Sequence, residues 1–237
     1  MRIALLGYGR MGKVIEGIAI NRGHEVILKI DVSNKADIGL INTENIEVVI
    51  EFSSPEAAFE NIRHCMQNGI PTVSGTTGWL DKKTEIDTLC IENNSAFFYA
   101  SNYSIGVNLF FRLNKQLAKL IAPYHNYSVS MEEIHHVLKL DAPSGTAITL
   151  AEGIIENNNR FDNWVNDVEP KENEINIESI REGLVPGTHN VKYISNIDTI
   201  TIGHEAHSRE GFALGAVIAA EWLIDKKGVK NMDDLLG

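Results

Sequence analysis

Two histidines, a lysine and a Ser-Gly-Thr turn lie within about a dozen residues near the middle of the chain. The segment reads Glu133-Ile134-His135-His136-Val137-Leu138-Lys139-Leu140-Asp141-Ala142-Pro143-Ser144-Gly145-Thr146-Ala147. Histidine exchanges protons near neutral pH, and lysine supplies a compact cation that can also donate a proton. The pattern therefore predicts a site that binds and protonates an acidic substrate, with His135 and Lys139 as the candidate catalytic residues.

The Ser-Gly-Thr turn is a candidate anion site. Pro143 cannot continue a preceding helix, and Ser144 suits the N-cap of a helix that we expect to end near residue 156. Such a cap leaves the backbone N–H groups of Gly145 and Thr146 to face a carboxylate at the positive end of the helix. Taken singly, a buried histidine or a surface lysine is the simpler interpretation, and only the combination favours catalysis.

A glycine-rich turn, Gly7-Tyr8-Gly9-Arg10-Met11-Gly12, follows an apolar run and opens a helical pattern near the start of the chain. A dinucleotide-binding GxGxxG turn requires these neighbours. Its first glycine permits a tight turn, its second lets a pyrophosphate approach the backbone, and its third allows close packing of helix on strand. We therefore predict that these six residues bind a nicotinamide dinucleotide. The alternative is a turn with a structural role only.

Two further features bear on the cofactor. Asp31 ends the second predicted strand, about 20 residues beyond the glycine turn, where an acid binds the adenosine ribose. An acid there favours NADH because it repels a 2′-phosphate, but Lys35 offsets that repulsion, so the sequence leaves NADPH open as well. The turn Gly75-Thr76-Thr77-Gly78 follows the fourth predicted strand, at the edge where α/β sheets bind ligands, and is predicted to contact the nicotinamide side.

The elements that would position these residues change in character along the chain. Strands predicted at 3–6, 25–30, 48–52, 71–74 and 96–99 alternate with helices predicted at 13–21, 55–68 and 80–93, which indicates a Rossmann-like, doubly wound parallel sheet. Beyond residue 101, a helix at 106–120 precedes strand-like segments at 128–134, 175–181, 190–194 and 199–202, with one helix at 145–156. This half predicts an α+β domain with a mostly antiparallel sheet.

Domain boundaries follow from this change in pattern. We expect a dinucleotide-binding domain over residues 1–104, completed by an Ala- and Gly-rich C-terminal helix within 208–237, and a second domain over residues 105–207. The acidic, asparagine-rich stretch 157–174 is expected to be a surface loop.

The composition is that of an ordinary globular protein, with 237 residues, 43% hydrophobic and 22% charged. The formal net charge is −11, whereas proteins that bind nucleic acid need a basic surface, so no nucleic-acid partner is expected. Cys65 and Cys90 fit neither a disulfide nor a metal pattern, and no metal is expected. The sequence has no signal-peptide anatomy and no membrane-length apolar run, which predicts a cytoplasmic protein without a membrane partner.

The segment 133–147 closely resembles the signature of the dihydrodipicolinate (4-hydroxy-tetrahydrodipicolinate) reductases of bacterial lysine and diaminopimelate biosynthesis. The resemblance covers nearly the whole chain. Besides the two glycine turns, it rests on Phe52-Ser53, Ala100-Ser101-Asn102-Tyr103-Ser104-Ile105-Gly106-Val107-Asn108, Ser179-Ile180-Arg181-Glu182-Gly183, Ser208-Arg209, Phe212-Ala213 and Gly215-Ala216.

This resemblance implies a hydride donor, NADH or NADPH, and a C-terminal domain that binds substrate and builds a homotetramer. It implies that His135 donates or accepts a proton, that Lys139 donates one, and that His136 contacts the substrate. The candidate substrate-binding residues are thus His136, Ser144, Gly145 and Thr146. The candidate cofactor-binding residues are Gly7, Tyr8, Gly9, Arg10, Met11, Gly12, Asp31, Lys35, Phe52, Ser53, Gly75, Thr76, Thr77, Ala100, Ser101, Asn102 and Tyr103.

Three features depart from the family pattern. The glycine turn is one residue shorter than the family's GxxGxxG, the segment between Asp31 and Ile46 is short, and the acid is aspartate rather than the more usual glutamate, with no arginine after it. All three concern cofactor preference and none touches the substrate motif.

The predicted reaction is the NAD(P)H-dependent reduction of 4-hydroxy-tetrahydrodipicolinate, a cyclic dicarboxylate, to tetrahydrodipicolinate. Once water has left the ring and a conjugated alkene has formed, a hydride would add at C4, and His135 or Lys139 would protonate the neighbouring carbon. The alternatives are a reductase of another cyclic dicarboxylate and a non-catalytic NAD-binding sensor. The sequence leaves the roles of Arg181 and Arg209 open.

Overall fold

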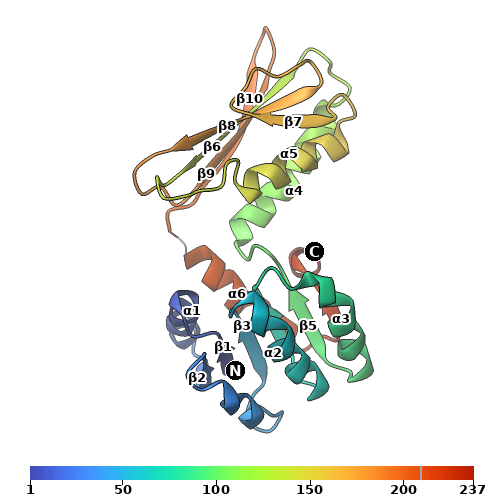
Figure 1. Ribbon diagram of the computed structural model, residues 1–237. Coiled ribbons are helices and arrows are strands. Elements are labelled where there is room, and N and C mark those ends of the chain that lie inside the picture. The colour runs from blue at the N-terminus through green and yellow to red at the C-terminus, as the bar shows by residue number, and fades with distance from the viewer. Residues whose placement is uncertain (209) are drawn as a thin grey trace. The chain divides into compact units, whose positions relative to one another are not determined.

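A computed structural model describes residues 1–208 and 210–237 of the chain. Arg209 lies outside the described residues. The chain divides into two compact units (Figure 1). One consists of Met1–Ile105 together with Glu210–Gly237, and the other begins at Gly106 and comprises the chain between them.

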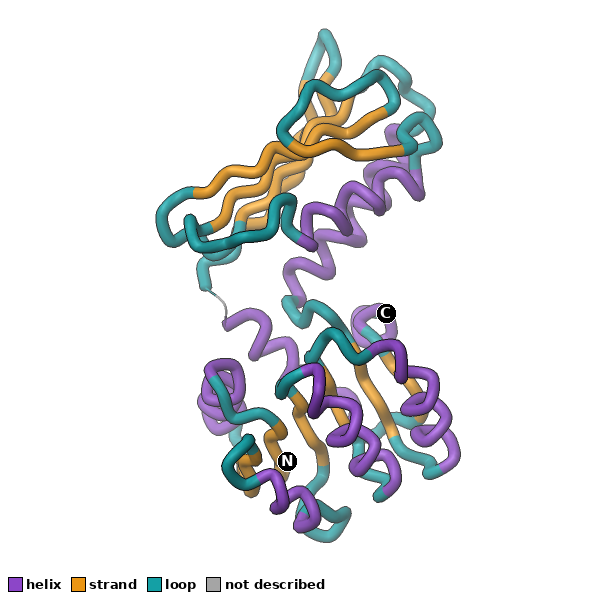
Figure 2. The backbone as a smooth tube through the Cα atoms, viewed as in Figure 1, coloured by secondary structure: helices purple, strands orange, loops and turns teal. Residues whose placement is uncertain are grey.

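The first unit contains a six-stranded sheet in the order β11-β5-β4-β3-β1-β2, and each pair of neighbouring strands in it is parallel. Figure 2 shows its strands in orange with purple helices around them. Its strands are β1 (Arg2–Leu6), β2 (Glu25–Ile30), β3 (Val48–Glu51), β4 (Thr72–Ser74), β5 (Ala96–Tyr99) and β11 (Gly228–Lys230). The strand order reverses at β1, which lies between β2 and β3. Such a switch point is where open α/β sheets bind ligands, outside the carboxyl ends of the strands.

Helices cover both faces of this sheet. Alternation along β1 directs Ile3 and Leu5 to one core and Ala4 and Leu6 to the other. The first core is closed by α1 (Arg10–Asn21) and α6 (Glu210–Leu223), and the second by α2 (Pro55–Gln67) and α3 (Lys83–Glu92). Short elements complete the unit: η1 (Lys35–Leu40), η2 (Leu80–Lys82) and α7 (Met232–Leu236). The doubly wound parallel sheet predicted from the sequence is confirmed.

Small residues let α6 approach the chain that leaves β5. A Cβ added at Gly215 would lie 1.7 Å from the carbonyl oxygen of Tyr103, a contact that no side chain could make. After α6 the chain adds β11 beside β5, an edge strand of three residues that sequence periodicity did not predict because it is too short to show any.

The second unit is a five-stranded sheet in the order β10-β9-β6-β8-β7, with two helices packed on one face (Figure 1). Its strands are β6 (Ser128–His135), β7 (Asn163–Asn166), β8 (Glu174–Arg181), β9 (Thr188–Ile194) and β10 (Thr199–Glu205), and its helices are α4 (Ile105–Ile121) and α5 (Gly145–Asn157). The core between helices and sheet includes Phe110, Leu150, Met131, Ile177 and Tyr193.

This sheet is mixed rather than mostly antiparallel as predicted. The β10–β9 and β9–β6 pairs are antiparallel, whereas β6–β8 and β8–β7 are parallel. The reason is that α5 carries the chain back between β6 and β7, and a helical crossover joins strands that run in the same direction. The segment 167–173 then returns the chain, so that β8 starts beside Asn163 of β7 and runs parallel to it. The predicted surface loop at 157–174 was also partly wrong, because β7 lies within it as an edge strand and its Trp164 packs against the core.

Among the described residues, none of the helices is both long enough and apolar enough to cross a membrane.

Candidate active site

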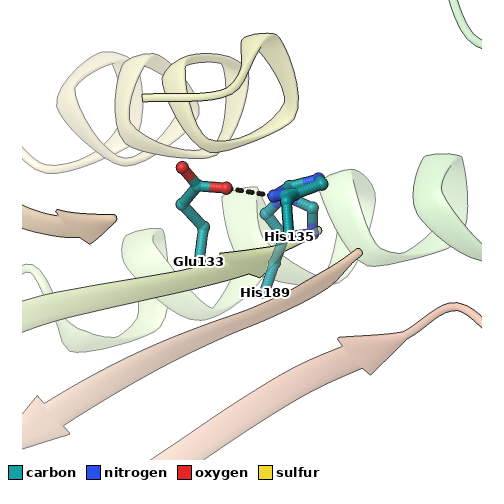
Figure 3. A group of neighbouring side chains, drawn as sticks. All are labelled: Glu133, His135 and His189. Atoms are coloured by element: carbon teal, nitrogen blue, oxygen red, sulfur yellow. Dashed lines mark hydrogen bonds and ion pairs between the residues drawn. The ribbon is translucent and has the colours of Figure 1, made fainter. Parts of the chain in front are cut away.

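The end of β6 carries a cluster of ionisable side chains. Alternation places Glu133 and His135 on the same face as Met131, which is the face that the helices cover. The register of the sheet places His189 of β9 opposite Glu133 and Arg181 of β8 opposite His135. Figure 3 shows the resulting convergence of Glu133, His135 and His189 from two neighbouring strands.

Glu133 is fully buried and holds a partner on each carboxylate oxygen. Its Oε2 is hydrogen-bonded to Nδ1 of His135, the dashed contact in Figure 3, and its Oε1 accepts from Nη2 of Arg181 at 2.8 Å. Burial acts to raise the pKa of Glu133, but hydrogen bonds from His135, Arg181 and Ser179 outweigh burial and lower that pKa to about 2. The carboxylate is thus kept charged inside the unit.

Neither Glu133 nor His189 was among the residues predicted from the sequence. Glu133 could have been found, because a residue two positions before His135 on an alternating strand must share its face. His189 could not, because its position depends on the pairing of β9 with β6. Arg181, whose role the sequence left open, joins the cluster through Glu133 and also donates from Nη2 to the backbone carbonyl of Asp141 at 2.7 Å.

His189 connects His135 to the Ser-Gly-Thr turn. It is buried, its Nε2 lies 3.1 Å from Oγ of Ser144, and its ring meets that of His135 edge to face with the centroids 5.1 Å apart. Burial lowers the pKa of His189 to about 3, assisted by the charge of His135. His189 is therefore neutral near pH 7.

The turn itself starts α5. Ser144 is the N-cap, as the sequence predicted, and its Oγ accepts from the N–H of Ala147 at 3.2 Å. The N–H groups of Gly145 and Thr146 precede the first intrahelical hydrogen bond and point out of the helix end. A Cβ at Gly145 would meet no atom within 4 Å, so the backbone there is open to a ligand. Substrate binding by the turn stays a prediction.

Lys139 lies in the loop between β6 and α5. Its Nζ donates to both carboxylate oxygens of Asp141, at 2.8 and 2.7 Å, and its backbone N–H donates to the carbonyl of His136. This ion pair lowers the pKa of Asp141. Because Arg181 holds the backbone of Asp141, the loop of Lys139 and the buried Glu133 share one anchor.

The glycine turn at the switch point fits a dinucleotide. A Cβ at Gly12 would lie 2.3 Å from the carbonyl oxygen of Gly7, and a Cβ at Gly7, where φ is +95°, would lie 2.1 Å from that of Phe52. These two glycines pack backbone on backbone, whereas a Cβ at Gly9 would meet nothing within 4 Å. The middle glycine therefore leaves open the space that a pyrophosphate at the start of α1 requires.

The rest of the turn is placed by side-chain contacts. Tyr8 donates its hydroxyl to Glu16, and Lys29 donates to the same carboxylate at 3.0 Å while lying 5.1 Å from the centre of the Tyr8 ring. Arg10 opens α1 with its side chain exposed, and Met11 packs partly against the core.

Asp31 is exposed just beyond β2, beside the glycine turn, because the N–H of Gly7 donates to the carbonyl of Ile30 at 2.8 Å. Its Oδ1 accepts from both the N–H and the hydroxyl of Ser33, which lowers the pKa of Asp31. Lys35 is exposed at the start of η1.

A second buried carboxylate, also absent from the sequence prediction, organises the next two loops. Glu51, at the end of β3, is fully buried and accepts four hydrogen bonds. Oε1 accepts from the N–H of Ser53 at 2.9 Å, from the Ser53 hydroxyl and from the Thr76 hydroxyl at 2.9 Å, and Oε2 accepts from the Ser74 hydroxyl at 2.7 Å. The hydroxyls of Ser53 and Thr76, together with the N–H of Ser53, are thus committed to Glu51.

The remaining cofactor candidates lie at the same carboxyl edge. Only glycine fits at position 75, because an added Cβ would lie 2.3 Å from the ring of Phe52. Thr77 is exposed. After β5, Ala100 is buried, Ser101 is exposed and Asn102 accepts through Oδ1 from the N–H of Ser104. Tyr103 is buried and donates to the carbonyl of Ser74 at 2.7 Å. All the cofactor candidates lie in the first unit and all the substrate candidates in the second, and their roles stay predictions.

Single ligand atoms of Glu133, His135 and His189 lie within 4.8 Å of one another, which is close enough for them to share a metal ion. This donor set would suit zinc. However, both oxygens of Glu133 are engaged, and the guanidinium of Arg181 lies 2.8 Å from one of them. A second cation would meet that charge, so the contacts favour proton chemistry, and the expectation that no metal binds stays a prediction.

The glycine turn at the switch point of a parallel sheet, together with a separate unit that carries an acid–base cluster, defines the class of two-unit, nucleotide-dependent oxidoreductases. Comparison with known families identifies which one. Residues 1–103 match the family model described as dihydrodipicolinate reductase, N-terminus, and residues 106–236 match dihydrodipicolinate reductase, C-terminus. The chain belongs to the dihydrodipicolinate reductase family.

Individual relatives agree with this. The chain is 53% identical over 236 residues to the 4-hydroxy-tetrahydrodipicolinate reductase of Christiangramia forsetii, covering 100% of this chain and 98% of that protein. It is 34% identical to the enzyme of the same name from Methanococcoides burtonii, covering 97% and 96%. The dipicolinate-bound dihydrodipicolinate reductase structure from Paenisporosarcina sp. TG-14 shares the fold, with a TM-score of 0.76 at 24% identity and coverage of 98% and 97%.

Proposed function

We propose that the protein reduces 4-hydroxy-tetrahydrodipicolinate to tetrahydrodipicolinate with a nicotinamide dinucleotide, in lysine and diaminopimelate biosynthesis. Full-length similarity to relatives of that name supports the proposal. The structural observation that carries it is the position of His135 between a charged carboxylate, Glu133, and the capped helix end at Ser144, which His189 links to it. An acid–base group beside an anion-binding turn suits an acidic substrate that must gain a proton.

In the proposed mechanism the second unit binds and protonates the substrate. The N–H groups of Gly145 and Thr146 hold one ring carboxylate, which fixes the ring in place. Lys139 offsets negative charge that builds up in the transition state. His135 donates a proton from Nε2, since its Nδ1 faces Glu133. The 4-hydroxyl leaves as water before reduction, and NAD(P)H, when bound, would supply the hydride that adds at the same carbon.

The first unit holds the cofactor, and we propose NADH as the preferred form. Asp31 lies exposed next to the glycine turn, with a lowered pKa, so it carries the negative charge that opposes a 2′-phosphate. Lys35 is exposed nearby and permits use of NADPH at a lower rate.

We further propose that the protein works in the cytoplasm as a homotetramer. Exposed apolar side chains on the second unit support an assembly, because such surface is usually covered by a partner. They include Leu109, Leu113 and Leu120 on α4, which are 50%, 49% and 69% exposed. Sedimentation equilibrium measures the state directly, and a monomer at micromolar concentration would contradict this part.

The deciding experiment is an assay of NADH and NADPH oxidation with substrate made in situ from pyruvate and aspartate semialdehyde by the synthase that joins them. Substrate-dependent loss of absorbance is the expected result, faster with NADH. Dipicolinate is a stable probe of the same site and is expected to inhibit competitively. NADH binding without turnover of this substrate would contradict the proposal and leave a sensor, or a reductase of another cyclic dicarboxylate.

A further inference from the structure

Glu133 has contacts that go beyond holding β6 in the sheet. It is a charged side chain with no exposure to solvent, and burying a charge is unfavourable unless the charge is paired and hydrogen-bonded. One oxygen faces Nδ1 of His135 and the other faces Nη2 of Arg181. Arg181 is anchored in turn by the carbonyls of Ile180 and Asp141.

These contacts fix how His135 carries its protons. A charged carboxylate can only accept, so the His135 nitrogen that faces it, Nδ1, must carry a hydrogen. In the neutral ring, Nε2 is then the unprotonated nitrogen. In the charged ring, Glu133 compensates the positive charge. Nε2 points toward the loop after β8, where a Cβ at Gly187 would lie only 3.0 Å from it.

We propose, as an extension of the proposed function, that Glu133 is a positioning residue that acts through His135. It sets the tautomer and orientation of the ring and stabilises the imidazolium that donates the proton at Nε2. Arg181 keeps the Glu133 carboxylate in place and ties it to the Lys139 loop through Asp141.

The other charged or titratable groups around this pair do not replace Glu133. From β8, Arg181 faces its second oxygen. From β9, His189 lies edge to face with His135 and is neutral near pH 7, with a pKa of about 3 set by burial. From the loop, Lys139 is paired with Asp141. Among these, Glu133 is the acceptor bonded to Nδ1 of His135.

Glu133→Gln gives a sharp test because Arg181 can only donate. The new amide must turn its oxygen to Arg181, which leaves its NH₂ facing His135 and requires Nδ1 to become the acceptor. We expect the ring nitrogen resonances of ¹⁵N-labelled histidine to show Nδ1–H for neutral His135 in the wild type and Nε2–H in Glu133→Gln. The ring resonances of His135 are assigned as those that disappear in the His135→Gln variant. An unchanged tautomer would overturn the proposal, and this readout does not depend on knowing the substrate.

Kinetics supply the second readout. General acid catalysis contributes about 10²–10⁴-fold, so we expect Glu133→Gln to lower kcat at least about tenfold, with the KM for NADH unchanged within about twofold. In a His135→Gln background, adding Glu133→Gln should change kcat less than about twofold, because the two residues act as one unit. An equal loss in both backgrounds would overturn the proposal.

The neighbouring residue is the matched control. Glu132 lies on the opposite face of β6, where it accepts from Asn190 at 2.9 Å, so Glu132→Gln should leave the tautomer and kcat unchanged. If Glu133→Gln does not fold, Glu133→Asp serves as the test in its place. This variant keeps a negative charge for Arg181, but its shorter side chain moves that charge away from Nδ1 of His135. A wild type that turns over no substrate yet shows the expected tautomers would refute the proposed function alone.

Discussion

The clearest quantitative prediction concerns Glu51, the buried carboxylate between the loops that follow β3 and β4. Glu51→Ala removes the acceptor of four hydrogen bonds. The N–H of Ser53 keeps a second acceptor, Oγ1 of Thr76 at 2.9 Å. The hydroxyls of Ser74 and Thr76 are buried and lose theirs, and an unsatisfied buried group costs about 1–3 kcal/mol. Two such groups predict a loss of about 3 kcal/mol in the free energy of unfolding.

Glu51→Gln is the matched variant. Its amide oxygen can occupy the Oε1 position and keep the donors from Ser53 and Thr76, while its NH₂ faces Ser74, whose hydroxyl can turn to accept. The predicted loss is only about 1 kcal/mol. For a chain of this size, 1 kcal/mol shifts Tm by about 2–4 °C. We therefore expect a decrease of about 6–12 °C for Ala and about 2–4 °C for Gln.

The assay is thermal unfolding without cofactor, together with NADH binding followed by fluorescence. Because Glu51 positions the backbones of Ser53 and Thr76, the Ala variant should bind NADH at least about tenfold more weakly and the Gln variant within about threefold. Equal Tm values for the Ala variant and the wild type would refute the reasoning. So would equal losses in the Ala and Gln variants, because the argument depends on the number of donors left without an acceptor.

Three other predictions address the second unit. Lys139→Ala should lower kcat at least about tenfold with NADH affinity retained, and a kcat within about threefold of wild type, about 0.7 kcal/mol, would exclude Lys139 from stabilising the transition state. Gly187→Ala should lower kcat because its Cβ would press on Nε2 of His135 from 3.0 Å, with no change in NADH affinity; unchanged kcat would show that Nε2 is not used. The pKa of His189 is about 3 in the folded protein and 6.5 when unfolded, so the unfolded chain binds more protons below pH 6.5 and stability is lost as pH falls from there toward 3. The free energy of unfolding measured in urea should therefore contain a contribution from His189 that is about 2 kcal/mol smaller at pH 5 than at pH 7. His189→Gln should remove that difference.

The sequence determined the larger features because they depend on local pattern. The apolar run into Gly7-Tyr8-Gly9, the alternation of strands and helices, and the Ser144 cap each need only neighbouring residues, and the structure has the parallel sheet, the switch-point turn and the capped helix where they were predicted. The residues of segment 133–147 likewise sufficed to indicate the family, which full-length comparison then showed.

Tertiary structure alone decided what those residues contact. The mixed order of the second sheet follows from the α5 crossover between β6 and β7 and from the return of the chain between β7 and β8, and its register brings His189 and Arg181 beside Glu133 across gaps of more than 40 residues. In the first unit, Glu51 reads in sequence as the end of an apolar strand. Two of its four donors, the hydroxyls of Ser74 and Thr76, come from β4 and the loop after it and reach Glu51 only when β3 and β4 pair. Sequence pattern fixes which face a side chain takes, but the partner opposite it depends on how distant strands pair, because that pairing is decided by the packing of the whole core.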